Sequence, residues 1–130
     1  MNLVDSSGWL EYLTEGRNAD FFAPTVEDTE HLMVSTINIY EVFKRVLRQR
    51  GEDAALQAAA LMQQATVVDV SPPIALDAAK LSAELKLPMA DSLILATARA
   101  YSATVWTQDA DFKGLPDVKF IGQQPKPKGR

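Results

Sequence analysis

The sequence contains no cysteine and only one histidine, His31. Disulfide bonds and thiolate metal sites are therefore excluded. A single histidine also rules out zinc sites built from several histidines and disfavours Ser-His-Asp catalysis. We interpret His31 as an ordinary surface or core residue. Any chemistry in this chain must rest on other side chains.

Long apolar runs are missing as well. No run approaches the roughly 18 residues of a membrane span, and no charged-then-apolar leader opens the chain. The segment Asn2-Leu3-Val4 is typical of a first strand. We therefore expect a cytoplasmic protein with no membrane partner.

Positive charge is scarcer than negative charge. The 13 Lys and Arg residues against 17 Asp and Glu residues leave a net charge of −4. This balance argues against binding nucleic acid through bulk electrostatics. The objection weakens if several acidic residues surround bound cations, because the ions reverse the local sign of the charge.

The bulk composition is that of an ordinary globular protein. The chain has 130 residues, of which 47% are hydrophobic and 23% charged. This size and balance predict a single domain over residues 1–122. Residues 123–130, rich in Gln, Pro and Lys, are predicted to form a mobile C-terminal tail.

Short apolar segments alternate with stretches of helical periodicity along the whole chain. Strands are predicted at residues 1–4, 32–34, 66–70, 104–107 and, as an edge strand, 119–121. Helices are predicted after the capping residues Asp5-Ser6-Ser7 and over residues 36–50, 52–65, 72–86 and 89–102. Apolar strands alternating with helices predict a three-layer α/β/α sandwich around a central, mainly parallel sheet of four to five strands.

Two details of this pattern matter below. The 36–50 helix, capped by Thr36 and ended by Gly51, carries its apolar residues at helical spacing. These residues are Ile39, Tyr40, Phe43, Val46 and Leu47. Residues 18–30 leave two alternatives open, because Phe21, Phe22 and Val26 favour a short helix whereas Pro24 and an acidic run favour a loop.

Acidic residues follow two of the predicted strands. Asp5 comes directly after the first strand, and Asp109 comes two residues after the 104–107 strand, with Asp111 two further on. In open α/β sheets the working site lies beyond the carboxyl ends of the strands. We therefore expect these side chains to present oxygens to a shared cavity. Taken singly, Asp5 could instead be a helix cap and Asp109 a turn residue.

Two further acids lie in helices. Asp91 is in the first turn of a helix that is apolar nearly all round, where a carboxylate is costly unless it is paired or bound to metal. The alternative is an acid stabilised by the helix dipole, by about 0.3–1 kcal/mol. Glu41 lies off the main apolar stripe of its helix, and its alternative is a surface pair with Arg45 worth about 0.2–0.5 kcal/mol.

Taken together, Asp5, Glu41, Asp91 and Asp109 make a coherent metal site. Mg²⁺ and Mn²⁺ are hard ions that prefer oxygen ligands. One or two such ions could assist a phosphodiester displacement. Without metal the clustered anions would repel each other and raise at least one pKa.

Four segments carry a resemblance to a known family. They are Leu3-Val4-Asp5-Ser6-Ser7, Ile39-Tyr40-Glu41-Val42, residues 87–98 (LPMADSLILATA), and residues 106–112 (WTQDADF). In this order they resemble the PIN domain, and within it the VapC-like toxins of toxin–antitoxin pairs. The first two segments are weak alone, and the last two are quite specific.

The resemblance implies roles for individual residues. Asp5, Glu41, Asp91 and Asp109 would occupy the four acidic positions of the family, and Asp111 an additional one. We expect Asp5, Asp91 and Asp109 to ligate the metal directly and Glu41 to act through water or a second ion. Ser6 and Thr107 fall where a hydroxyl near the metal would orient its water.

The resemblance also implies an activity and partners. These are a Mg²⁺- or Mn²⁺-dependent, single-strand-directed endoribonuclease acting on structured RNAs such as transfer or ribosomal RNA, homodimerisation, and inhibition by a small antitoxin. Lys44, Arg45 and Arg48 share a helix face with Glu41 and are candidate RNA contacts, or else a solvated face with intrahelical pairs. Trp9 and Trp106 are predicted to be core residues.

Three other functions stay open from the sequence. The chain could be a PIN-like module that binds RNA or a partner without cutting. It could be an acidic α/β partner protein whose carboxylates are surface features. It could also be a phosphatase or a DNA nuclease that uses the same ions.

Overall fold

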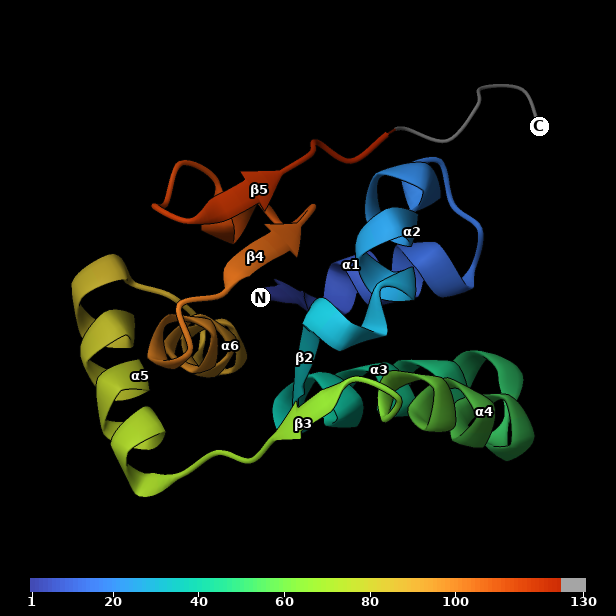
Figure 1. Ribbon diagram of the computed structural model, residues 1–130, viewed down its shortest axis with the longest axis horizontal. Coiled ribbons are helices and arrows are strands. Elements are labelled where there is room, and N and C mark those ends of the chain that lie inside the picture. The colour runs from blue at the N-terminus through green and yellow to red at the C-terminus, as the bar shows by residue number, and fades with distance from the viewer. Residues whose placement is uncertain (125–130) are drawn as a thin grey trace.

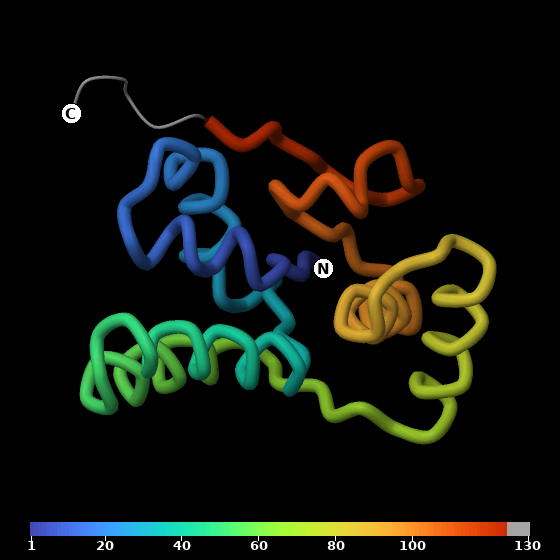
Figure 2. Tube along the Cα trace, turned by 180° about the vertical axis from the view of Figure 1, so that it is seen from behind, coloured from blue at the N-terminus to red at the C-terminus, as the bar shows by residue number. Residues whose placement is uncertain are grey.

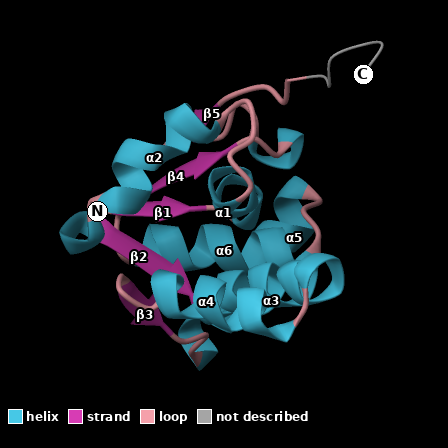
Figure 3. Cartoon of the chain, turned by 90° about the vertical axis from the view of Figure 1, so that its right-hand side faces the viewer, coloured by secondary structure: helices cyan, strands magenta, loops and turns pink. Residues whose placement is uncertain are grey.

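The structure, a computed structural model, describes residues 1–124 and contains one parallel sheet. Its strands are β1 (Asn2–Val4), β2 (Leu32–Ser35), β3 (Thr66–Val68), β4 (Thr104–Thr107) and β5 (Val118–Phe120). The five strands lie in the order β3-β2-β1-β4-β5, as Figure 3 shows, and each pairing is parallel. The predicted sheet is therefore confirmed.

Helices cover both faces of the sheet. They are α1 (Ser6–Leu13), α2 (Ala19–Glu27), α3 (Thr36–Arg50), α4 (Glu52–Met62), α5 (Pro72–Leu85) and α6 (Met89–Ala100), with the short 3₁₀ turns η1 (Thr29–His31) and η2 (Ala110–Phe112). Figure 1 shows α1 to α4 on one side of the strands and α5 and α6 on the other. This is the predicted three-layer sandwich. Over residues 1–124, no helix is both long and apolar enough to cross a bilayer.

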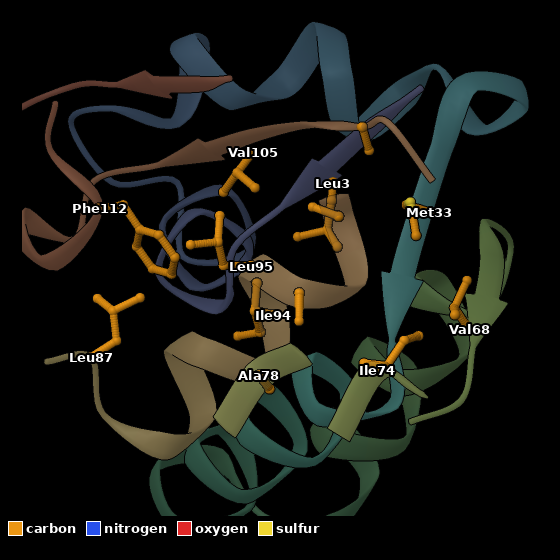
Figure 4. Close-up of a cluster of buried hydrophobic side chains, with 13 residues drawn as sticks. Leu3, Met33, Val68, Ile74, Ala78, Leu87, Ile94, Leu95, Val105 and Phe112 are labelled. Carbon is orange, nitrogen blue, oxygen red and sulfur yellow. The ribbon is translucent and has the colours of Figure 1, made fainter. Parts of the chain in front are cut away.

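Alternation along the strands divides the core into two halves. Leu3 and Met33 point toward α5 and α6, where Figure 4 shows them with Leu95 of α6. Their chain neighbours Val4 and Val34 point to the opposite face and pack among residues of α1 to α4. Because successive strand side chains face opposite sides, each short strand feeds both cores.

Residues 18–30 form the helix α2 followed by η1, although Pro24 lies inside the helix. An interior proline costs about 3 kcal/mol. Phe22 and Val26, one turn apart, are both buried in the core, and each contributes about 1.5–3 kcal/mol. Burial on one face therefore outweighs the proline.

Several predicted boundaries are wrong, among them the end of α6, which lies at Ala100 rather than at residue 102. Ser35, not Thr36, caps α3, because its hydroxyl accepts from the backbone N–H of Ile37 at 3.1 Å. Strand β3 ends at Val68 rather than at residue 70, since its partner β2 ends at Ser35, the residue paired with Val68. Helix α4 ends at Met62 rather than at residue 65, where the chain turns at residues 63–64.

The apolar stripe of α3 is also displaced from the predicted one. Its buried positions are Asn38, Val42 and Val46, spaced one turn apart. Tyr40 and Leu47 instead face outward, and Tyr40 is 61% exposed. Residues at positions i, i+4 and i+8 lie on the helix face that packs on the sheet, whereas residues on either side of this stripe can face solvent.

The remaining predictions on single residues have mixed outcomes. Trp9 is a core residue as predicted. Trp106 is only partly buried: its Nε1 donates to Asn2 Oδ1 at 2.9 Å, and its ring packs on Phe21. His31 is exposed and pairs with Asp28 at 3.0 Å.

The C-terminal segment after β5 runs beside the α1–α2 connection, as Figure 2 shows. The side-chain amide of Asn18 donates to the carbonyl of Gly122 at 3.0 Å and joins the two segments. The predicted tail at 123–130 lies, from residue 125 onward, outside the described residues.

Gly8 in α1 provides a test of this packing. A Cβ built there would lie 2.6 Å from Phe22 Cε1 and 2.7 Å from Val4 Cγ1. Helix propensity alone predicts that Gly8→Ala stabilises the protein by about 1 kcal/mol. The structure predicts the opposite sign, a net loss of about 1–2 kcal/mol, because overpacking a core costs more than propensity returns.

Urea unfolding measures this difference. Gly122→Ala is the matched control, because a Cβ at Gly122 meets nothing within 4 Å. It should change the stability by less than about 0.5 kcal/mol. A Gly8→Ala variant that is more stable than wild type would contradict the close contact of α1 with Phe22.

Candidate active site

The order in which the chain adds strands to the sheet reverses between β1 and β4. The chain proceeds outward from β1 through β2 to β3, and then crosses back to place β4 and β5 on the other side of β1. At such a switch point the helices leave opposite faces and a crevice opens beyond the carboxyl ends of the strands. Asp5 and Asp109 follow these two central strands, and the backbone N–H of Asp5 donates to the Trp106 carbonyl at 2.9 Å.

An open cavity of about 360 Å³ lies at this place. All four predicted acids line it: Asp5, Glu41, Asp91 and Asp109. The other lining residues are Ser6, Ser7, Leu10, Tyr40, Lys44, Arg45 and Arg48. Residues from α1, α3, α6 and the segments that follow β1 and β4 thus meet in one cleft, as the sequence predicts.

Asp5 is held firmly beneath the cavity. It is 3% exposed, and its Oδ2 accepts from Ser7 Oγ at 2.8 Å and from Thr107 Oγ1 at 3.0 Å. Burial raises the pKa of Asp5 above its usual value, and the Asp109 charge acts in the same direction. The two hydroxyl donors oppose this shift in pKa, because they stabilise the ionised form.

Asp91 lies in the first turn of α6 and is 9% exposed. Burial, a hydrogen bond to the Asp111 carboxyl group and the charges of Asp109 and Asp5 together raise the pKa of Asp91 to about 8. A helix dipole would lower the pKa of an acid at this position. The opposite direction argues against Asp91 as a dipole-stabilised surface acid.

Glu41 does not pair with Arg45. Its Oε1 accepts from Ser6 Oγ at 2.7 Å, and the only ion pair within 4 Å over residues 1–124 is that of His31 and Asp28. The alternative of a Glu41–Arg45 surface pair is therefore not realised. Lys44, Arg45 and Arg48 line the acidic cavity without a carboxylate within 4 Å.

A buried amide orients the hydroxyl that holds Glu41. Asn38 is fully buried, and its Oδ1 accepts from the Ser35 backbone N–H at 3.1 Å. Since a backbone N–H can only donate, the amide nitrogen of Asn38 must face Ser6 Oγ, to which it donates at 3.0 Å. Ser6 then has its own hydrogen free for Glu41.

The hydroxyl groups of the site therefore donate hydrogen bonds to its carboxylates. Ser6 and Thr107, predicted near the metal and its water, bind Glu41 and Asp5 directly. Sequence reasoning missed Ser7 and Asn38 as members of the site. Ser7 could have been noticed beside Asp5 in the Asp5-Ser6-Ser7 run, and Asn38 from its capping-box spacing after Ser35.

The residues present fit a hard divalent cation. Asp91, Asp109 and Asp111 each place a carboxylate oxygen within 4.8 Å of the others. Two oxygens on opposite sides of a Mg²⁺ ion, each at about 2.1 Å, would lie about 4.2 Å apart, so little movement is needed. An all-oxygen donor set without histidine or cysteine is what Mg²⁺ and Mn²⁺ prefer.

Comparisons with known proteins agree with this geometry. Residues 3–118 match the PIN domain family model. The chain is 35% identical over 96 residues to Ribonuclease VapC4 of Mycobacterium tuberculosis, covering 68% of this chain and 74% of that protein. This protein therefore belongs to the PIN-domain family, and the predicted resemblance is confirmed.

Solved structures share the whole fold. A toxin–antitoxin complex from Klebsiella pneumoniae is similar with a TM-score of 0.75 at 26% identity, over 92% of this chain and 96% of that one. VapC20 of Mycobacterium tuberculosis, described as a sarcin-ricin loop cleaving toxin, has a TM-score of 0.77 at 19% identity. That likeness covers 96% of this chain and 100% of VapC20.

The raised pKa of Asp91 predicts how stability depends on pH. In the unfolded chain this carboxyl titrates near 3.9, whereas the folded protein holds the proton up to about pH 8. The contribution of Asp91 to the free energy of unfolding is therefore fully present below about pH 4. It is lost as the pH rises from about 4 to 8. In EDTA at pH 8, Asp91→Asn should be more stable than wild type by about 1–2 kcal/mol, or about 3–6 °C in Tm.

Thermal unfolding at pH 5 and pH 8 tests this prediction. The gain from Asp91→Asn should shrink at pH 5, and adding Mn²⁺ should raise the Tm of wild type but not of the variant. A variant that is less stable than wild type at pH 8 without metal would mean that Asp91 has a structural role instead.

Proposed function

We propose that this protein is a Mg²⁺- or Mn²⁺-dependent endoribonuclease and the toxin of a toxin–antitoxin pair. One observation carries the proposal: carboxylates from four separate parts of the chain line a single cleft at the switch point of the sheet. Membership of the PIN-domain family and the ribonuclease relative support the same activity. RNA is the proposed substrate, and transfer or ribosomal RNA follows from the family resemblance.

The acidic residues divide the work. Asp5, Asp91 and Asp109 would hold the cation. Carboxylate oxygens of Asp91 and Asp109 lie within 4.8 Å of each other and of Asp111, and Asp5 lines the same cavity outside this group. When bound, the cation would supply an activated water and stabilise charge that develops on the phosphate oxygens. Asp91 must give up its proton for this, so cation binding should strengthen as the pH rises toward 8.

Glu41 has a different environment from the three aspartates. Ser6 occupies its Oε1, and Asn38 directs the Ser6 hydrogen toward it. A carboxylate held in this way keeps acceptor capacity for a water molecule in the cavity. Glu41 would orient that water and receive its proton, which removes the need for a histidine base.

Lys44, Arg45 and Arg48 would guide the phosphate backbone into the cleft. They line the same cavity as the acids and have no carboxylate partner within 4 Å among residues 1–124. Such side chains can form charge-assisted hydrogen bonds to phosphate, which are stronger than hydrogen bonds between neutral groups. The local wall of positive charge also answers the objection raised by the net charge of −4.

Two protein partners belong to the proposal. A small antitoxin is supported by the similar structure from Klebsiella pneumoniae, which is a toxin–antitoxin complex. Homodimerisation is supported by exposed apolar side chains on α3 and α4, among them Leu47 and Leu56. Burial of such residues favours association.

Activity assays test the nuclease. Asp5→Asn and Asp91→Asn should each lower RNA cleavage in Mg²⁺ or Mn²⁺ by at least about 100-fold, because each removes a ligand charge. EDTA should abolish cleavage by wild type. Asp77→Asn, an exposed acid on α5, is the matched control and should cut normally.

The outcomes separate the competing functions. Full activity of both active-site variants would refute the proposed mechanism. Binding of RNA without any cleavage by wild type would favour a non-cutting module. Faster cleavage of single-stranded DNA, or of a phosphomonoester, would favour the DNA nuclease or the phosphatase.

Charge reversal tests the basic wall. Arg48→Glu should weaken RNA binding at low salt by about tenfold or more and should reduce the slope of log K against log[salt] by about 1. Arg99→Glu, at the exposed end of α6, changes the net charge equally and should have a smaller effect. Equal effects of the two variants would mean that only the overall charge matters.

A further inference from the structure

Tyr40 lies outside both hydrophobic cores of residues 1–124. It belongs to the apolar residues of α3 by type, but its side chain is 61% exposed and lies off the buried stripe of Asn38, Val42 and Val46. It nevertheless lines the acidic cavity, directly before Glu41 in the chain. An exposed aromatic ring at the wall of a reaction site is a candidate for contact with the substrate.

The neighbours of Tyr40 are those that a nucleotide requires. Lys44 lies one helical turn further on, with its Nζ 5.7 Å from the centre of the Tyr40 ring. Arg45, Arg48 and Glu41 of the same helix also line the cavity. One helix thus presents an aromatic face, cations and a carboxylate to the same cavity of about 360 Å³, which lies within the size range of small-ligand pockets.

We propose that Tyr40 is a stacking site for one unpaired nucleobase beside the scissile phosphate. This inference rests on the proposed function and names how that site selects its substrate. A base within a duplex has both faces covered by its neighbours, so only a single-stranded or extruded base can stack on the ring. Lys44, whose ammonium lies over one face of the ring, would contact the phosphate attached to a base stacked on the other face.

A protein partner is the competing use of an exposed tyrosine. The centre of a protein interface is depleted of charged residues. Tyr40 instead borders Glu41 and Lys44, and the cavity that it lines holds three cations and four carboxylates. This setting favours a charged, stackable ligand over an apolar protein surface.

A double-mutant cycle between Tyr40 and the base tests the proposal. A single-stranded RNA pool of random sequence identifies a cleaved sequence, which is then synthesised with an abasic site at each position flanking the cleaved bond. On intact RNA, Tyr40→Ala should raise KM about tenfold, within the roughly 5- to 150-fold range expected for losing one stacked base, whereas Tyr40→Phe should keep the wild-type KM. On the RNA that is abasic at the stacking position, wild type should lose the same factor and Tyr40→Ala should lose nothing further.

The controls separate stacking from other effects. Tyr101→Ala removes another exposed tyrosine, which follows α6 ten residues after Asp91, or about 15 Å along the helix axis, and it should leave KM unchanged. The Tm and the oligomeric state of Tyr40→Ala should equal those of wild type.

Each other outcome overturns the inference. An unchanged KM for Tyr40→Ala, or equal losses on intact and abasic RNA, refutes the base site while leaving the nuclease standing. A changed oligomeric state with an unchanged KM assigns Tyr40 to a protein interface. If wild type cuts no RNA at all, the proposed function fails, and the base site fails with it.

Discussion

The candidate active site is governed by the repulsion between carboxylates that the fold holds close together. Asp91, Asp109 and Asp111 bring oxygens within 4.8 Å of each other, and the buried Asp5 adds its charge to theirs. No polypeptide gains stability from such an arrangement without a cation or a proton to neutralise it. Burial of Asp91, its hydrogen bond to Asp111 and this repulsion together raise the pKa of Asp91, so that its carboxyl group is neutralised by a proton.

The surrounding polar residues keep these carboxylates in place. Ser7 and Thr107 hold Asp5, and Asn38 acts through Ser6 on Glu41. The same Asn38 side chain closes the capping box of α3, so the start of the helix and the orientation of Glu41 both depend on one buried amide. The parts of the site that bear charge are therefore supported by the parts that define the fold.

The cleft of this acidic protein is lined by positive as well as negative side chains. The net charge of −4 describes the whole chain, but the cleft gathers charge of both signs. Its four carboxylates are suited to cations, and Lys44, Arg45 and Arg48 of α3 are suited to phosphate. A divalent ion and a phosphate group that bind between them would each meet charge of the opposite sign.

The sequence by itself determined the layers, the parallel sheet and the four acids, because hydrophobic periodicity and the position of a residue after a strand are local properties. It also excluded cysteine chemistry and metal sites built from several histidines. It could not decide whether Pro24 broke a helix, which face of α3 would carry Tyr40, or whether Arg45 would pair with Glu41. Those outcomes depended on contacts between segments far apart in the chain: Phe22 and Val26 in the core, Val42 and Val46 against the sheet, and Ser6 reaching Glu41 across 35 residues. Only the tertiary structure decided them, because each is a competition between a local preference, from about 0.2 kcal/mol for an ion pair to about 3 kcal/mol for a proline, and the burial or hydrogen bonding that folding supplies.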